Sequence, residues 1–205
     1  IFATSRQNLE SILFAMLISY SDASGTVDSE DALVISGFVS TAAKWMNFEK
    51  QWLQILGDFD VAYFHMKEFA HSTGAYKGWK GDERRREAFI KRLVSACISN
   101  AIYSFSCAIL LWDWTQVNLK FKYRERTGGP YAMCGRGYIA DVQSWHKDST
   151  YHDVPIDFVF EDGDKHKGKL IEHLEKYKYP LPSFKSKLPS KTGPSTPVVP
   201  LQAAD

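Results

Sequence analysis

The chain has 205 residues, of which 44% are apolar and 14% aromatic, and its formal net charge is +1 at pH 7. A chain of this length fits one domain with a buried core, and this composition excludes an intrinsically disordered protein. The small net charge excludes a strong overall field toward nucleic acid or membrane, so any such attraction must come from a local patch.

Cysteine content and hydropathy further limit the classes of protein to which the chain can belong. The three cysteines form no CxxC pair, and an odd count without such a pair argues against a disulfide framework and a structural zinc site. Free cysteines are typical of a reducing compartment, and no apolar run approaches the length of a membrane span. We therefore expect a cytoplasmic protein with no membrane partner.

The first part of the chain predicts two strands followed by a helix. Residues 12–21 are apolar, β-branched and aromatic without helical period, residues 22–31 are turn formers, and residues 33–39 are apolar again; this pattern indicates a hairpin. Residues 41–57 carry one apolar stripe at three- and four-residue steps, with Thr41 as N-cap. The stripe consists of Trp45, Phe48, Trp52 and Ile55.

The middle of the chain predicts two more strands among helices. Residues 60–66 have the composition of a short strand, and residues 67–81 are irregular. Asp82 opens a helix with acids before bases, the order that favours the helix dipole. Residues 103–112 are mainly apolar and predict a strand, after which Asp113 can cap a helix to about residue 121.

The last third predicts alternating helices and strands that end in a linker. In order, we expect a basic loop over 122–130, a helix over 131–146, a strand over 154–160, a helix capped by Asp164 to about 177, a short strand at Phe184, an extended linker over 189–200, and a final helix with Pro200 in its first turn.

This order of elements predicts an α/β fold. Early antiparallel strands followed by strands separated by helices indicate a mixed five-stranded sheet with helices on both faces. We expect residues 1–11 to be an N-terminal extension and residues 12–205 to form a single domain. Because the sequence ends a few residues into a predicted helix, we also expect that domain to be truncated at its C-terminal helix.

Three carboxylates stand where such a sheet would bring them together. Asp22 follows the first apolar strand, Glu161 follows the strand at 154–160, and Asp205 follows the short stretch Leu201-Gln202-Ala203-Ala204. In α/β sheets, sites form beyond the carboxyl ends of the strands. Oxygen ligands of this kind suit a hard divalent cation.

Four motifs, in order along the chain, carry a family resemblance. They are Tyr20-Ser21-Asp22-Ala23-Ser24-Gly25, Phe64-His65-Met66, Phe160-Glu161-Asp162-Gly163-Asp164 and Leu201-Gln202-Ala203-Ala204-Asp205. Together they resemble the family known as domain of unknown function 3800, which is similar to the RNase H-like superfamily of nucleases, integrases and resolvases.

The resemblance implies an RNase H-like sheet whose first strand is central and has a parallel neighbour. It places the family acids on Asp22, Glu161 and Asp205 as metal ligands and catalytic residues, whereas Ala23 stands where the family commonly has another acid. Two Mg²⁺ or Mn²⁺ ions held by such acids can activate a water and stabilise the leaving oxygen of a phosphodiester. We therefore expect a divalent-metal-dependent nuclease.

Other residues near these acids are further candidates for a role in the site. His65, Asp162 and Asp164 are candidates for a fourth ligand or a proton shuttle, although His65 also fits a packed, hydrogen-bonded histidine and Asp164 a helix cap. The main acids have an alternative interpretation too: Asp22 as a turn residue, Glu161 as a solvated side chain and Asp205 as a chain end.

A lysine cluster follows Glu161 and suggests contact with nucleic acid, DNA or RNA. Lys165, Lys167, Lys185 and Lys187 are candidates for binding phosphates, and Lys122, Arg124 and Arg126 form a second basic group. Tyr76 and Trp79 are candidates for stacking on bases. Solvated surface lysines are the simpler alternative.

The alternative function for the whole protein is a catalytically inactive module on the same fold that binds nucleic acid or a protein partner.

Overall fold

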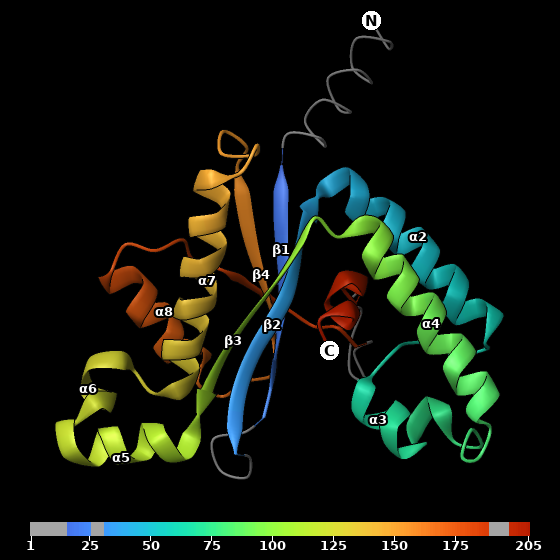
Figure 1. The fold of residues 1–205 in the computed structure, drawn as a ribbon, viewed down its shortest axis with the longest axis horizontal. Coiled ribbons are helices and arrows are strands. Elements are labelled where there is room, and N and C mark those ends of the chain that lie inside the picture. The colour runs from blue at the N-terminus through green and yellow to red at the C-terminus, as the bar shows by residue number, and fades with distance from the viewer. Residues whose placement is uncertain (1–15, 26–30, 189–196) are drawn as a thin grey trace, which may run out of the picture.

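The computed structural model describes residues 16–25, 31–188 and 197–205, and its centre is one five-stranded sheet (Figure 1). The strands are β1 (Leu17–Ser24), β2 (Ala32–Thr41), β3 (Tyr103–Leu110), β4 (Ile156–Glu161) and β5 (Ser183–Lys185). Their spatial order is β3-β2-β1-β4-β5. β1 is therefore the central strand.

The sheet is mixed, as the sequence predicts. β1 is antiparallel to β2 and parallel to β4, β2 is antiparallel to β3, and β4 is parallel to β5. The register pairs Ser21 with Phe160, so Asp22 and Glu161 come next on adjacent parallel strands. Side chains in register on neighbouring strands share a face, and both carboxylates therefore stand on one face at the same end of the sheet.

Helices α7 (Pro130–Asp148) and α8 (Lys167–Lys176) cover one face of the sheet (Figure 1). Alternate residues of the strands point into this layer, among them Leu33, Ile35, Phe158 and Phe160. They pack against Tyr138 and Ile139 of α7 and against Leu170 and Leu174 of α8 in one buried cluster. Because Phe158 and Phe160 point into this layer, the alternation of side chains along β4 directs Glu161 toward the opposite face.

The opposite face carries an aromatic layer. It is formed by α2 (Ala42–Asp58), α3 (Met66–His71), the 3₁₀ helix η1 (Gly74–Tyr76), α4 (Glu83–Asn100) and the C-terminal 3₁₀ helix η2 (Val199–Ala203). Its buried rings include Trp45, Phe48, Trp52, Phe64, Phe69, Tyr76, Trp79 and Phe89. Tyr76 and Trp79 are 0% and 4% exposed, so the prediction that they stack on bases is wrong.

The predicted helix ends are confirmed at two positions. The Thr41 side chain accepts a hydrogen bond from the backbone N–H of Lys44, and that of Asp82 accepts one from Arg85, as N-caps do. Asp113 lies inside the first turn of α5 (Leu111–Phe121) and Leu110 is its N-cap residue, so the prediction that Asp113 caps this helix is wrong.

Two short segments also differ from their predictions. Residues 60–66 form no strand, because Asp60 takes a left-handed backbone conformation and the Val61 N–H returns to the Leu56 carbonyl to close α2. The expected loop over 122–130 contains the short helix α6 (Tyr123–Thr127).

The C-terminal third follows the prediction with one change. The short strand at Phe184 is confirmed as β5, and Pro200 lies in the first turn of η2. The change is at Asp164: α8 begins at Lys167 with His166 as its N-cap residue, so the prediction that Asp164 caps this helix is wrong. Asp164 instead accepts a hydrogen bond from the N–H of His166. The predicted extension over 1–11 and most of the predicted linker lie outside the described residues. Among the helices that the structure does describe, none is long and apolar enough to span a membrane.

Candidate functional site

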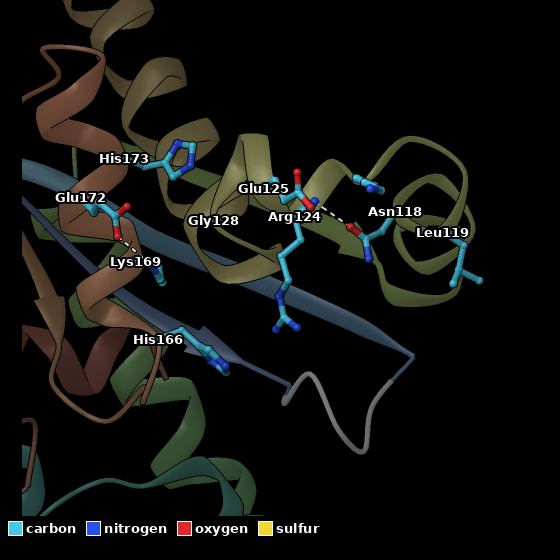
Figure 2. A pocket seen from close by; sticks show the side chains of 10 residues that line it. Asn118, Leu119, Arg124, Glu125, Gly128, His166, Lys169, Glu172 and His173 are labelled. Carbon is cyan, nitrogen blue, oxygen red and sulfur yellow. Dashed lines mark hydrogen bonds and ion pairs between the residues drawn. The ribbon is translucent and has the colours of Figure 1, made fainter.

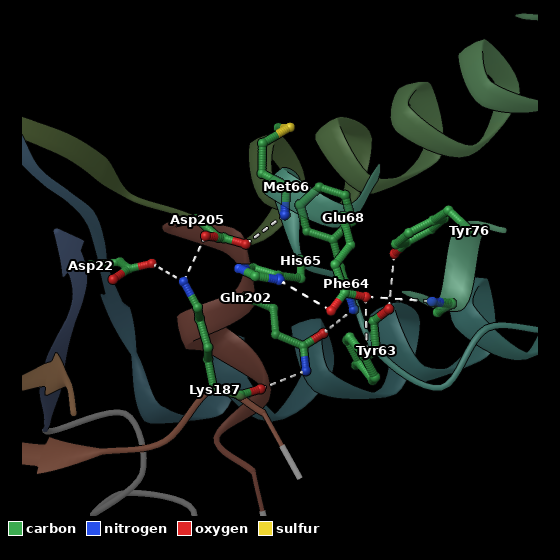
Figure 3. Close-up of polar contacts among 11 residues, drawn as sticks. Asp22, Tyr63, Phe64, His65, Met66, Glu68, Tyr76, Lys187, Gln202 and Asp205 are labelled. Atoms are coloured by element: carbon green, nitrogen blue, oxygen red, sulfur yellow. Dashed lines mark hydrogen bonds and ion pairs between the residues drawn. The ribbon is translucent and has the colours of Figure 1, made fainter. Parts of the chain in front are cut away.

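The candidate site lies at the carboxyl end of β1 and β4, and its centre is a lysine between two aspartates (Figure 3). The Lys187 ammonium forms an ion pair with Asp22 Oδ2, and its Nζ lies 2.6 Å from Asp205 Oδ1. These three residues come from β1, from the segment after β5 and from the end of η2. The fold thus gathers charge from both ends of the described chain.

Backbone donors hold the two aspartates in place. The Ala23 N–H donates to Asp22 Oδ1 at 2.7 Å, and the Met66 N–H, in the first turn of α3, donates to Asp205 Oδ2 at 2.7 Å. Each carboxylate therefore has one oxygen bound to the backbone and the other to Lys187. Charge-assisted hydrogen bonds of this type are short and strong, so both carboxylates are fixed in orientation.

Glu161 is the third carboxylate at this edge. Burial, followed by the carboxylate of Asp22, raises its pKa to about 7, while Lys187 acts in the opposite direction. A Cβ on Gly163 would lie 2.5 Å from Glu161 Oε2, so a larger residue there would displace this carboxylate from its present position. Asp205 also acts on the pKa of Glu161, which means that all three acids share one electrostatic environment.

Three negative charges and one positive charge meet here. Burial raises the pKa of Asp22 in spite of Lys187. Burial would lower the pKa of Lys187, but the two aspartates raise it above its usual value. When all three acids are ionised, a single ammonium leaves the cluster with an excess of negative charge, which is costly unless a carboxylate takes up a proton or another cation joins it.

Gln202 connects this cluster to the aromatic layer. Its Oε1 accepts hydrogen bonds from Trp52 Nε1 at 3.0 Å and from the Phe64 N–H at 2.8 Å, and its Nε2 donates to the Lys187 carbonyl at 3.0 Å. The side chain is 2% exposed. Gln202 therefore fixes both η2, which carries Asp205, and the backbone of Lys187.

His65 lies beside the cluster, and Glu68 is a carboxylate close to its ring. The His65 ring stands between Glu68 and Asp205 in Figure 3, with Nδ1 3.6 Å from Glu68 Oε1. Glu68 in turn accepts from the Tyr63 hydroxyl at 2.9 Å. The His65–Glu68 separation is too long for a hydrogen bond, and His65 Nδ1 has no hydrogen-bond partner within the described residues. The sequence analysis missed Glu68, although its spacing from His65 across the first turn of a helix is a usable signal.

Asp162 and Asp164 turn away from the centre. Asp162 forms an ion pair with Lys167, and Asp164 Oδ1 lies 2.6 Å from the His166 N–H and 3.0 Å from its Nδ1. In the part of the chain that the structure describes, neither residue forms a hydrogen bond or ion pair with Asp22, Lys187 or Asp205. Both are engaged in the turn that leads from β4 into α8.

The four lysines singled out in the sequence lie in different environments. Lys165 and Lys185 are exposed, and Lys167 is half-buried. Lys185 pairs in register with Glu161 across β4 and β5, which places it at the rim of the carboxylate site. Lys187 is buried at 8% exposure, and its ammonium faces the aspartates.

Within residues 16–25, 31–188 and 197–205, no three His, Cys, Asp or Glu side chains form a group arranged to hold a metal ion. Lys187 takes the central position that such a group would surround.

No protein-family model, no curated protein and no solved structure matches the chain.

Proposed function

We propose that this protein is an RNase H-like, divalent-metal-dependent nuclease that hydrolyses phosphodiester bonds of nucleic acid. The observation that carries the proposal is the meeting of Asp22, Glu161 and Asp205 around a single buried cation, Lys187. The central β1 with its parallel neighbour β4 supports the same proposal, because the acids stand at the shared carboxyl end of these strands.

The donor set fits Mg²⁺ or Mn²⁺. All three candidate ligands are carboxylates, the hard oxygen donors that these ions prefer. The excess negative charge beside Lys187 gives a divalent cation an electrostatic reason to enter. When bound, the cation would supply Lewis-acid polarisation of the phosphate and a nucleophilic water at neutral pH.

The remaining side chains have separate roles in this proposal. Asp22, Glu161 and Asp205 bind the cation. Lys187, released from the two aspartates, can turn its ammonium toward a phosphate oxygen because its stem is flexible. His65, which lies beside Glu68 and the aspartates, would move a proton at the reacting oxygen. Lys185 at the rim can contact a neighbouring phosphate.

The test is cleavage of labelled single- and double-stranded DNA and RNA with Mg²⁺ or Mn²⁺. Asp22→Asn should lower the rate at least about 100-fold, more than the loss of a group behind a ligand usually does. Asp157→Asn, an exposed residue of β4, is the matched control and should leave the rate unchanged. A wild-type protein that cleaves none of the four substrates and binds neither metal would overturn the proposal.

Lys187 favours one alternative, a catalytically inactive module that binds nucleic acid or a protein partner. Because its ammonium already forms ion pairs with Asp22 and Asp205, the site is partly neutralised without a metal. The two functions separate in one experiment. The inactive module binds its partner equally well after chelation and in Asp22→Asn, and shows no cleavage in either state.

A further inference from the structure

A cavity lies on the other face of the sheet, between the α5–α6 segment and α8 (Figure 2). Its volume is about 670 Å³, and three basic side chains line it: Lys122, Arg124 and Lys169. Glu125 and Glu172 also line it, and Lys169 is paired with Glu172 at 2.7 Å. The cavity therefore has more positive than negative charge.

Two of these cations have no protein partner within the described residues. None of the hydrogen bonds or ion pairs found there involves the Arg124 guanidinium or the Lys122 ammonium. The Arg124 backbone is nevertheless anchored, because its N–H donates to Asn118 Oδ1 at 2.6 Å. In Figure 2 the Arg124 side chain extends from α6 across the opening toward His166. An anchored backbone with an unsatisfied guanidinium is suited to a ligand that accepts two parallel hydrogen bonds.

A buried histidine forms another wall of the cavity. His173 is 6% exposed, and its Nδ1 has no hydrogen-bond partner within the described part of the chain. Gly128 faces it with a φ of 74°, and a Cβ there would lie 2.6 Å from His173 Cδ2. The wall thus depends on glycine at position 128 for its shape, because Gly128 has a left-handed backbone and lies against the His173 ring.

The cavity stands near the end of the sheet that carries the carboxylates. His166, which lines it, is bonded to Asp164 in the turn that follows Glu161. In Figure 1, α6 lies outward of α7, toward the same end of the molecule as the end of β1. The carboxylates and the cavity therefore lie on opposite faces of the sheet, and the turn from Glu161 to His166 connects them along the chain.

We propose that this cavity binds a backbone phosphate of a nucleic-acid strand, with Arg124 and Lys122 as its principal contacts. The inference rests on the proposed function, since it places a second phosphate of the same substrate away from the reacting one. A phosphate has the charge and the paired acceptor oxygens that Arg124 requires. Contacts of this kind position a strand without reading its sequence.

The test is equilibrium binding of a labelled single-stranded oligonucleotide, about a dozen nucleotides long to cover a typical site size. Binding is measured in chelator, so that neither a metal nor cleavage enters the result. Arg124→Ala should weaken binding about tenfold, as loss of a charge-assisted contact does. Each of Arg124→Ala and Lys122→Ala should also reduce the salt dependence of log K by about 0.7, the value for one phosphate contact on a single strand.

Lys91→Ala is the matched control, because Lys91 is exposed on α4, across the sheet, and pairs with Glu87. Competition with inorganic phosphate and with a mononucleotide distinguishes a strand site from a site for a free anion. Inhibition by a longer strand at far lower concentration than by either small ligand supports the inference. Equal inhibition by inorganic phosphate, or Arg124→Ala binding as tightly as Lys91→Ala, overturns it.

The two proposals fail in different ways. If the wild type binds the oligonucleotide through Arg124 but never cleaves it, only the nuclease proposal falls. If Asp22→Asn abolishes cleavage while Arg124→Ala leaves binding and its salt dependence unchanged, only the phosphate cavity falls.

Discussion

The aromatic layer and the carboxylate edge lie on the same face of the sheet, yet they are organised in opposite ways. In the aromatic layer, buried rings pack edge-on or tilted against one another, as Trp79 does on Phe89 with centroids 5.3 Å apart. At the carboxylate edge, three acids face one ammonium. The first region stabilises the fold by burial of apolar surface, and the second retains uncompensated charge.

Gln202 is where the two regions meet. It bonds Trp52 of the aromatic layer on one side and the backbone of Lys187 on the other. The rigid layer thus holds the charged groups at fixed positions that they would not keep by themselves. Precise placement of binding groups by well-packed neighbours is what a functional site requires.

Phe89→Ala should produce the largest loss of stability and separates the two regions most clearly. Phe89 is 0% exposed and contacts several rings, so its truncation should cost about 4 kcal/mol of unfolding free energy. Metal affinity of the molecules that remain folded should not change. Urea unfolding and calorimetric titration measure the two quantities.

Ile98→Ala on the same helix is the control for this truncation. Ile98 is 75% exposed, and its loss should change the unfolding free energy by less than about 0.5 kcal/mol. If Phe89→Ala weakened metal binding as strongly as it weakened folding, the two regions would not be separable in the way described here.

Lys187→Met tests the charged region through its effect on the free energy of unfolding. Methionine keeps much of the apolar stem but leaves Asp22 and Asp205 without their ammonium, which should cost about 3 kcal/mol in the absence of metal. For a chain of this size that corresponds to a fall in Tm of roughly 6–12 °C. Mg²⁺ should restore much of the loss in the variant.

The comparison with wild type decides this prediction. If the proposed cation binds between these carboxylates, Lys187 competes with it, and Mg²⁺ should raise the Tm of Lys187→Met more than that of the wild type. An equal or smaller rise in the variant would mean that the cation does not enter between these carboxylates.

The two regions were also unequally predictable from sequence. The apolar stripe of Trp45, Phe48 and Trp52 predicts α2 because helical period is a local property. The segment 60–66 was misassigned because Val61 and Phe64 are apolar for a tertiary reason, as they fill the aromatic layer. Left-handed backbone at Asp60 then ends the helix without a glycine.

The geometry of the charged edge was predictable only in part. Asp22 and Glu161 stand side by side because strand ends meet at one edge, which alternation and order along the chain can indicate. The position of Lys187 had no local signal. Among many lysines in the last quarter, its burial depends on two aspartates at opposite ends of the chain, and a contact of that range is absent from composition and spacing.

Glu68→Gln should have an intermediate effect that is confined to the charged region. Glutamine can still accept from the Tyr63 hydroxyl but no longer carries the charge beside His65, so Mn²⁺ affinity or cleavage rate should fall about tenfold. Glu83→Gln, an exposed change at the start of α4, is the control. A Glu68→Gln protein with an unchanged pH–rate profile would show that His65 needs no carboxylate behind it.

Glu161→Gln should have the smallest effect and reveals the charge excess through pH. Since burial and the Asp22 carboxylate raise the pKa of Glu161 from 4.5 to about 7, the folded state holds this proton more tightly than the unfolded state. The stabilising contribution is therefore complete below pH 4.5 and is lost as pH rises through about 7. Because the side chain is partly exposed, the loss should be about 1–2 kcal/mol.

Urea unfolding of the metal-free protein at pH about 5 and about 8 measures this linkage. Glu161→Gln should reduce the decline seen in the wild type, whereas Glu175→Gln, an exposed change on α8, should leave it intact. Saturating Mg²⁺ should also flatten the wild-type decline, because a cation that binds ionised Glu161 removes the advantage of the protonated form. If Glu161→Gln lost stability as steeply as the wild type between these pH values, the decline would come from Asp22 and not from Glu161. Asp22 and Asp205 would then share the site beside the aromatic layer, and Glu161 would lie outside it.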